Sequence, residues 1–170
     1  MSSAESCITR ALVEKAQPII DALRKRDLSV VTAESCTAGL IAAILSHAQH
    51  AGECLHGGFV VYSKEHKASS LGVDAALLKS EGSVTAEVAL QMALGALKRS
   101  RADVSLSVTG VLGPDPDEDG NPAGLVFFSA CRDGSEPLTL MRKFDCAGPD
   151  SVRWCAVEQG LELLLQMARM

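Results

Sequence analysis

Three apolar runs in this sequence each end in a polar turn, and segments with helical periodicity separate them. The turns read TAESCTAG (residues 32–39), YSKEHK (62–67) and TGVLGP (109–114). Strands that alternate with helices form parallel sheets, and ligands of such sheets bind at the carboxyl ends of the strands. The pattern therefore predicts an α/β protein whose functional residues gather at one edge of the sheet.

Five segments have the alternation and β-branched content of strands. The first three are expected at 28–32, 57–63 and 102–110. Two later runs, 125–132 and 138–146, alternate well enough to pair as an antiparallel hairpin around DGSEP. Because helices separate the early strands and a hairpin comes late, the sheet should be mixed and largely parallel.

Helical patterns fill the remaining chain. They are expected at 8–26, with Pro18 a place for a bend, and at 37–46, 64–71, 74–80, 83–102 and 150–167. Asp74 is suited to cap the fourth of these helices. Helices on both faces of one sheet give a three-layer α/β/α sandwich, and no linker or repeat divides residues 1–170 into more than one domain.

Composition excludes several function classes. The net charge of −5 argues against a surface that coats nucleic acid, and no apolar run approaches the ~18 residues of a membrane span. The cysteines are scattered without a C-x-x-C pair, so we expect reduced thiols in a cytoplasmic protein without a secretory leader. The histidines, at 47, 50, 56 and 66, lack an acidic partner that would complete a metal set, so no metal or cofactor is expected.

The ESCTAG turn places several reactive side chains at the start of a helix. Ser35 or Thr37 would serve as a helix cap, which is the ordinary use of such residues. A hydroxyl at this position is also suited to act as a nucleophile, because backbone amides at a helix N-terminus stabilise an oxyanion. Cys36 is a second candidate nucleophile, although a lone cysteine is more often a small core residue.

A serine nucleophile needs a base, and no histidine is anchored by an evident acid. Lys67 is the alternative, provided that burial or another cation lowers its pKa from about 10.4 toward neutrality. Without such a shift Lys67 is an ordinary solvated lysine. Tyr62, the only tyrosine, follows the second strand and is suited to orient the lysine, to donate to a substrate or to cover the core edge.

The third turn, TGVLGP, offers backbone N–H groups and the Thr109 hydroxyl to a phosphate or an oxyanion. Its glycines, Gly110 and Gly113, are equally consistent with a purely conformational role. The acidic run at 115–119 would repel phosphate, so we expect it at the rim of the site.

Five ordered segments resemble the CinA C-terminal domain family, the nicotinamide-nucleotide amidohydrolases. They read TAESCTAG, GGFVVYSKEHKASSLGV, EGSVTAEVALQMALGAL, ADVSLSVTGVLGP and PAGLVFFS. The resemblance is close over residues 28–129 and looser in the flanking helices. It is to the stand-alone form of the family, without the N-terminal molybdopterin-binding-like domain of longer CinA proteins.

The resemblance implies a three-layer α/β/α fold and hydrolysis of nicotinamide mononucleotide to nicotinate mononucleotide and ammonia. It implies that Ser35 is the nucleophile and that Lys67 and Thr109 match family positions. With the residue-level reasoning, the expected catalytic residues are Ser35, Lys67, Thr109 and Tyr62. The expected substrate-binding residues are Thr37, Gly39, Gly58, Gly110, Gly113 and Arg153.

The sequence departs from the family pattern at four places. Ala38 replaces a glycine, YSKEHK replaces YSNEAK and so adds Lys64 and His66, the loop after Gly113 reads GPDPD, and Arg153 lacks the arginine of the family's GDR segment. A methyl group at position 38 would obstruct a close approach of substrate. The alternative function is therefore a nucleotide-binding paralogue with little or no turnover. The expected partner is a small molecule. The last helix has enough apolar residues to cover one face of the sheet and also to form an interface in a homo-oligomer.

Overall fold

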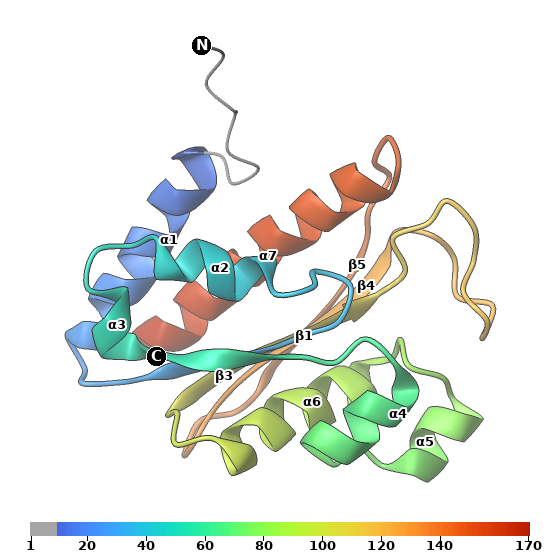
Figure 1. Ribbon diagram of the computed structural model, residues 1–170, viewed down its shortest axis with the longest axis horizontal. Helices are drawn as coiled ribbons and strands as arrows, with labels where there is room; N and C mark the ends of the chain where they lie inside the picture. Colours follow the sequence, from blue (N-terminus) through green and yellow to red (C-terminus); the bar gives the residue numbers. More distant parts are fainter. Residues whose placement is uncertain (1–9) are drawn as a thin grey trace.

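The computed structural model describes residues 10–170, in which the strands form one sheet in the order β2-β1-β3-β4-β5 (Figure 1). The strands are β1 (Val30–Glu34), β2 (Leu55–Val60), β3 (Val104–Gly110), β4 (Leu125–Arg132) and β5 (Leu138–Lys143). Strand β1 pairs in parallel with both β2 and β3, whereas β4 is antiparallel to β3 and to β5. The mixed sheet and its late hairpin are thus confirmed.

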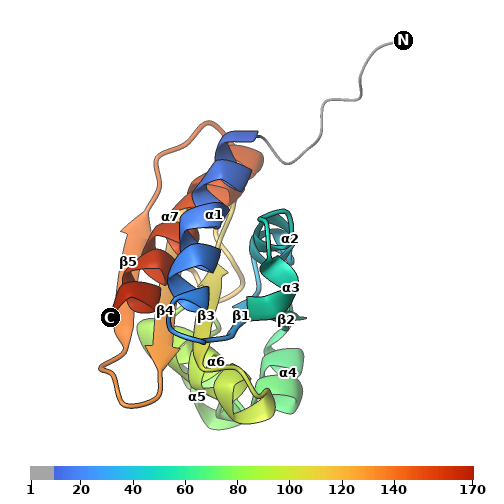
Figure 2. The ribbon, with the colours of Figure 1, turned by 90° about the vertical axis from the view of Figure 1, so that its left-hand side faces the viewer.

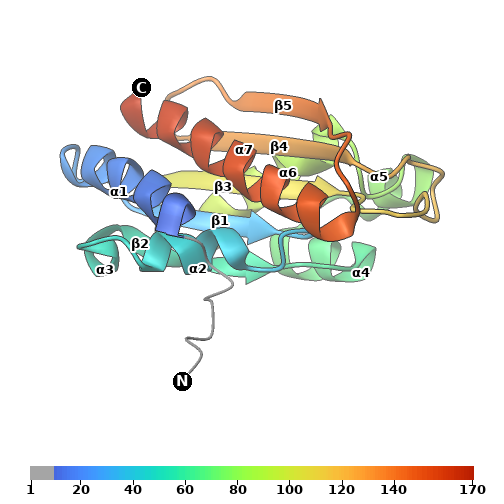
Figure 3. The same ribbon diagram turned by 90° about the horizontal axis from the view of Figure 1, so that it is seen from above.

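Helices cover both faces of this sheet. One face carries α1 (Arg10–Arg24), α2 (Leu40–Ser46), α3 (Ala51–Cys54) and α7 (Pro149–Arg169). The other carries α4 (Lys64–His66), the π-helical turn η1 (Lys67–Leu71), α5 (Ala75–Ser80) and α6 (Ala86–Arg99). Figures 2 and 3 show the sheet between the two groups, which is the expected three-layer sandwich.

Strand β1 is the centre of the parallel part, and all its residues are buried. Successive strand residues point to opposite faces, so Val31 and Ala33 join the core under α6. Thr32 and Glu34 point to the opposite face, toward α2, although both are polar and fully buried. A buried carboxylate at the end of a central strand requires hydrogen-bond partners, and the turn before α2 supplies them.

Most differences from the expected elements concern their ends. Helix α2 begins at Leu40 rather than at residue 37, because Ala38 and Gly39 take left-handed φ angles of 53° and 91° that interrupt the helical path. The expected single helix at 64–71 divides into α4 and η1 and ends at left-handed Gly72. Asp74 caps α5 as expected, by accepting a hydrogen bond from Ala76 N. The beginning of the helix expected at 8–26 lies outside the described residues.

The described residues contain no helix with both the length and the apolar character of a membrane crossing. The cysteines at 36, 54, 131, 146 and 155 are all free. Within the same residues, no three His, Cys, Asp or Glu side chains gather in a way that would hold a metal ion.

Candidate active site

The carboxyl ends of β1, β2 and β3 lie at one edge of the sheet, since Glu34 is paired with Val60 on one side and with Val108 on the other. A cavity of about 500 Å³ opens at this edge. Its lining includes six of the predicted site residues: Ser35, Tyr62, Thr109, Gly110, Gly113 and Arg153. The parallel topology therefore brings together residues from all three polar turns.

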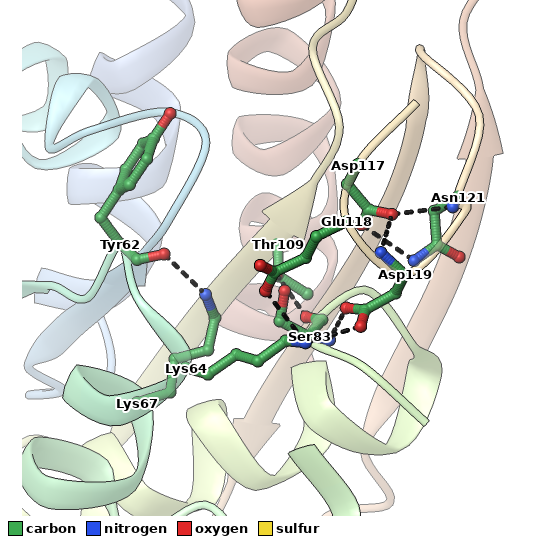
Figure 4. A network of polar contacts seen from close by, with 9 residues as sticks. All are labelled: Tyr62, Lys64, Lys67, Ser83, Thr109, Asp117, Glu118, Asp119 and Asn121. Carbon is green, nitrogen blue, oxygen red and sulfur yellow. Dashed lines mark hydrogen bonds and ion pairs between the residues drawn. The ribbon is translucent and has the colours of Figure 1, made fainter. Parts of the chain in front are cut away.

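Lys67 lies beside this cavity and contacts the candidate nucleophile directly. Its Nζ donates a hydrogen bond to Ser35 Oγ at 3.0 Å. It also donates to the backbone carbonyl of Tyr62 at 3.2 Å (Figure 4). The side chain is almost completely enclosed, because Lys67 is 1% exposed and Ser35 6%. Lys67 is the first residue of a π-helical turn, and such turns are frequent at functional sites.

Burial has a direct consequence for the chemistry of Lys67. Desolvation of the ammonium lowers the pKa of Lys67 from 10.5 to about 8; Cys36 opposes this shift, and the nearby charge of Lys64 adds to it. A lysine with this pKa is partly neutral near physiological pH. Neutral Lys67 has a lone pair and lies within hydrogen-bond distance of Ser35 Oγ, so it has the geometry of a general base.

Lys67 should lower the stability of the protein below pH 8. Its pKa is lower in the folded than in the unfolded chain, so the unfolded state binds more protons and stability rises as the pH increases from about 8 to 10.5. Lys67→Met, which removes the buried charge, should therefore raise the free energy of unfolding by about 1–3 kcal/mol at pH 7. Urea denaturation at pH 7 and pH 10 should show this gain shrinking at the higher pH; a variant less stable than wild type at pH 7 would contradict it.

Cys36 lines the same cavity, but burial raises its pKa, whereas burial lowers that of Lys67. It is buried, and desolvation raises the pKa of its thiol to about 12. Because the thiolate is the nucleophilic form, a thiol that stays protonated at neutral pH is a poor nucleophile. The geometry thus favours Ser35 over Cys36.

Glu34, which the sequence reasoning did not assign to the site, anchors the turn that carries Ser35. Its carboxylate accepts hydrogen bonds from the backbone N–H groups of Gly39 (3.0 Å), Ile41 (3.1 Å) and Ala42 (2.9 Å). It also accepts from the Thr32 hydroxyl at 2.9 Å. Glu34 therefore satisfies the N-terminus of α2, the role that the sequence suggested for Ser35 or Thr37.

The chain bends sharply between Glu34 and α2, and two amides in this bend remain free. In the described part of the chain, neither Cys36 N–H nor Thr37 N–H donates a hydrogen bond, whereas Ser35 N–H donates to Val108 O at 2.9 Å. The free amides come directly after Ser35, where donors to an oxyanion are needed.

Several predicted residues do not line the cavity. Thr37 is buried, and its hydroxyl finds no hydrogen-bond partner within residues 10–170. Gly39 N–H is occupied by Glu34. Gly58 lies within β2, where a Cβ would stand 2.6 Å from Thr32 Oγ1, so its small size serves packing. Ala38 is exposed and outside the lining, so its methyl group does not narrow the cavity.

The Thr109 hydroxyl has a partner within the protein, and Tyr62 contacts Lys67 through its backbone. The Thr109 hydroxyl donates to Ser83 O at 2.8 Å, which joins the end of β3 to the segment before α6. Tyr62 contacts Lys67 through its backbone carbonyl, while its side chain is exposed, with the residue as a whole 71% accessible. The Tyr62 ring is thus free to meet a ligand, whereas Thr109 shapes the cavity wall.

Arg153 is the only basic side chain among the described residues that line the cavity. It comes from the first turns of α7, and its Nε donates to Cys36 O at 3.4 Å. A second hollow, of about 660 Å³, lies at the opposite end of the sheet around Ser29 and Asp103. Arg24 and Glu53 form an ion pair there, and Asp103 accepts hydrogen bonds from Ser29, but no buried hydroxyl–amine pair lies in this hollow as it does beside the Ser35 cavity, so the Ser35 cavity is the better candidate for chemistry in the described residues.

The structure is that of an α/β protein with a buried serine–lysine pair at the edge of a mixed sheet. The family model of the CinA C-terminal domain matches residues 13–168, and the chain belongs to this family. It is 36% identical over 155 residues to the nicotinamide-nucleotide amidohydrolase PncC of Escherichia coli K12, covering 91% of this chain and 93% of that protein. A putative competence-damage inducible protein of Caldicellulosiruptor bescii is 42% identical over 130 residues, which are 76% of this chain and 31% of that one.

Solved structures agree with this assignment. The competence/damage inducible protein CihA of Agrobacterium tumefaciens superposes with a TM-score of 0.90 at 35% identity, covering 95% of this chain and 98% of that chain. A CinA-superfamily protein of Escherichia coli superposes with a TM-score of 0.87 at 32% identity, covering 95% and 94%. The three-layer fold is thus that of the family.

Proposed function

We propose that this protein is a serine-dependent amidohydrolase that converts nicotinamide mononucleotide to nicotinate mononucleotide and ammonia. The observation that carries the proposal is the 3.0 Å hydrogen bond between Lys67 Nζ and Ser35 Oγ at the wall of a cavity. The identity to PncC, a nicotinamide-nucleotide amidohydrolase, supports this substrate class.

In the first step, Ser35 Oγ attacks the carboxamide carbon while neutral Lys67 takes the hydroxyl proton. Negative charge develops on the carboxamide oxygen, and the free amide of Cys36, a residue that lines the cavity, is the proposed donor to it. The C–N bond then breaks, Lys67 returns its proton to the leaving nitrogen, and ammonia departs. The product of this half-reaction is an ester of Ser35.

Water completes the reaction. Neutral Lys67 takes a proton from the water that attacks the ester carbonyl, and the proton then returns to Ser35 Oγ as the ester bond breaks. The acid formed in this way gives its remaining proton to solvent, and nicotinate leaves as a carboxylate. Each proton accepted by Lys67 is donated again, and neither step calls on a metal ion or a redox cofactor.

The remaining lining residues are assigned to substrate binding. Arg153 is the proposed partner of the phosphate, and Gly110 and Gly113 form the part of the cavity wall where backbone groups are open to the nucleotide. At Gly110 a Cβ would stand 2.7 Å from Leu125 O, so this position tolerates no larger residue without a shift of the backbone. The ring of Tyr62 is available to stack on the pyridine.

The test is an ammonia assay with the purified chain and nicotinamide mononucleotide, nicotinamide and related amides, with and without a chelator. We expect ammonia from the mononucleotide and no effect of the chelator. Tight binding of the mononucleotide without ammonia would instead identify a binding paralogue. We further expect action on a free small molecule in the cytoplasm.

The rate should depend on pH through Lys67. Because only neutral Lys67 accepts a proton, kcat/KM should be low at pH 6, rise through an apparent pKa of about 8 and level off above it. The measurement is ammonia release between pH 6 and pH 9.5 at constant ionic strength. A rate independent of pH across this range would exclude Lys67 as the base.

A further inference from the structure

The acidic loop between β3 and β4 is joined to α4 by one lysine. Lys64 Nζ lies 3.0 Å from Glu118 Oε1 and 2.6 Å from Asp119 Oδ1. Asp119 in turn accepts a hydrogen bond from Ser83 N at 3.3 Å. Figure 4 shows Lys64 reaching across to this loop on the side of the network opposite Asn121. The loop therefore meets α4, the helix that leads into Lys67, through a single cation.

This contact changes the charge at the mouth of the cavity. Asp115, Asp117 and Glu118 all line the cavity, and Arg153 is the basic residue there in the described chain. Arg153 is itself paired with Asp150 at 3.1 Å, so part of its charge is already offset. Without a further cation, an anionic substrate would meet a mouth with excess negative charge.

We propose that Lys64 is a specificity-determining residue, which offsets the carboxylates of Glu118 and Asp119 so that a phosphate-bearing substrate can enter. The inference rests on the proposed function for its ligand, a nucleoside monophosphate, but it concerns binding rather than turnover.

The offset acts mainly through charge rather than through rigid attachment. Partly exposed ion pairs contribute little to the stability of a fold, and Lys64 and Asp119 keep side-chain exposures of 29% and 22%. The field of a charge near a cavity mouth, in contrast, acts on every anion that enters. A structural attachment and a charge offset therefore predict different effects when one of the acids is neutralised.

The experiment compares Lys64→Met with Glu118→Gln by calorimetric binding of nicotinate mononucleotide and of its phosphate-free nucleoside. Lys64→Met should raise the Kd of the mononucleotide about 5-fold and leave that of the nucleoside within about 2-fold. Glu118→Gln breaks one of the two ion pairs of Lys64 but removes a negative charge, so it should lower the Kd of the mononucleotide. The effect of Lys64→Met should shrink at high ionic strength.

Opposite signs for the two variants would support the charge offset. Equal weakening by both, or equal loss for nucleotide and nucleoside, would overturn it in favour of a structural attachment. Lys15→Met is the matched control, because Lys15 forms ion pairs with Glu158 and Glu162 between α1 and α7. Because binding needs no turnover, absence of ammonia from the unsubstituted protein would contradict the proposed function alone.

Discussion

Ser35→Ala and Lys67→Met should each slow ammonia release by at least about 10³-fold, and the double variant should be scarcely slower than either one. The reason is that the two side chains form one unit. Lys67 has no proton to take when the Ser35 hydroxyl is absent, and Ser35 is a weak nucleophile without a base. Single-turnover and steady-state rates of the three variants measure the coupling.

Lys67→Arg extends the same prediction. The guanidinium stays protonated and cannot accept the serine proton, so this charge-conserving variant should be as slow as Lys67→Met. Lys79→Met in α5 and Ser46→Ala in α2 are exposed controls of the same residue types. The paired mechanism would be contradicted if the rate reductions of the two single variants multiplied in the double variant, or if Lys67→Arg released ammonia at a near-normal rate. Either result would show that Lys67 and Ser35 act independently.

The meeting of Ser35, Lys67 and Thr109 was predictable because it follows from topology. Parallel strands end at one edge, so polar turns after three such strands lie near one another whatever their exact boundaries. The pairing of Ser35 with Lys67 followed from this placement, from the lack of a histidine anchored by an acid, and from the family resemblance, which matches both positions. That hypothesis required a lowered pKa of Lys67, and burial of the side chain in the fold lowers it.

The function of Glu34 could not be read from the sequence in the same way. Helix caps are recognised when the capping side chain precedes its N–H partners by two or three residues. Glu34 reaches amides five, seven and eight residues further along, across a turn that takes left-handed angles at Ala38 and Gly39. The packing role of Gly58 is hidden from the sequence for a related reason, since the contact that requires a glycine there comes from Thr32 on the neighbouring strand.

Glu34→Gln should lower the free energy of unfolding by about 2–4 kcal/mol, although the side chain keeps nearly the same shape. The carboxylate is completely buried and accepts four hydrogen bonds, three of them from the N-terminus of α2. An amide replaces one acceptor oxygen by a donor NH₂, so one or more buried N–H groups lose their acceptor and face a second donor. Urea denaturation at pH 7 measures this loss.

The same substitution should also reduce turnover in the fraction that remains folded, because Ser35 directly follows Glu34 and the free amides of Cys36 and Thr37 belong to the turn that Glu34 holds. Glu87→Gln, an exposed change in the first turn of α6, is the matched control and should leave stability and rate nearly unchanged. A kcat reduced together with a normal pH profile would mark Glu34 as a positioning residue, since the base and its pKa remain. A Glu34→Gln protein with wild-type stability and wild-type kcat would show that the anchored turn has no part in presenting Ser35.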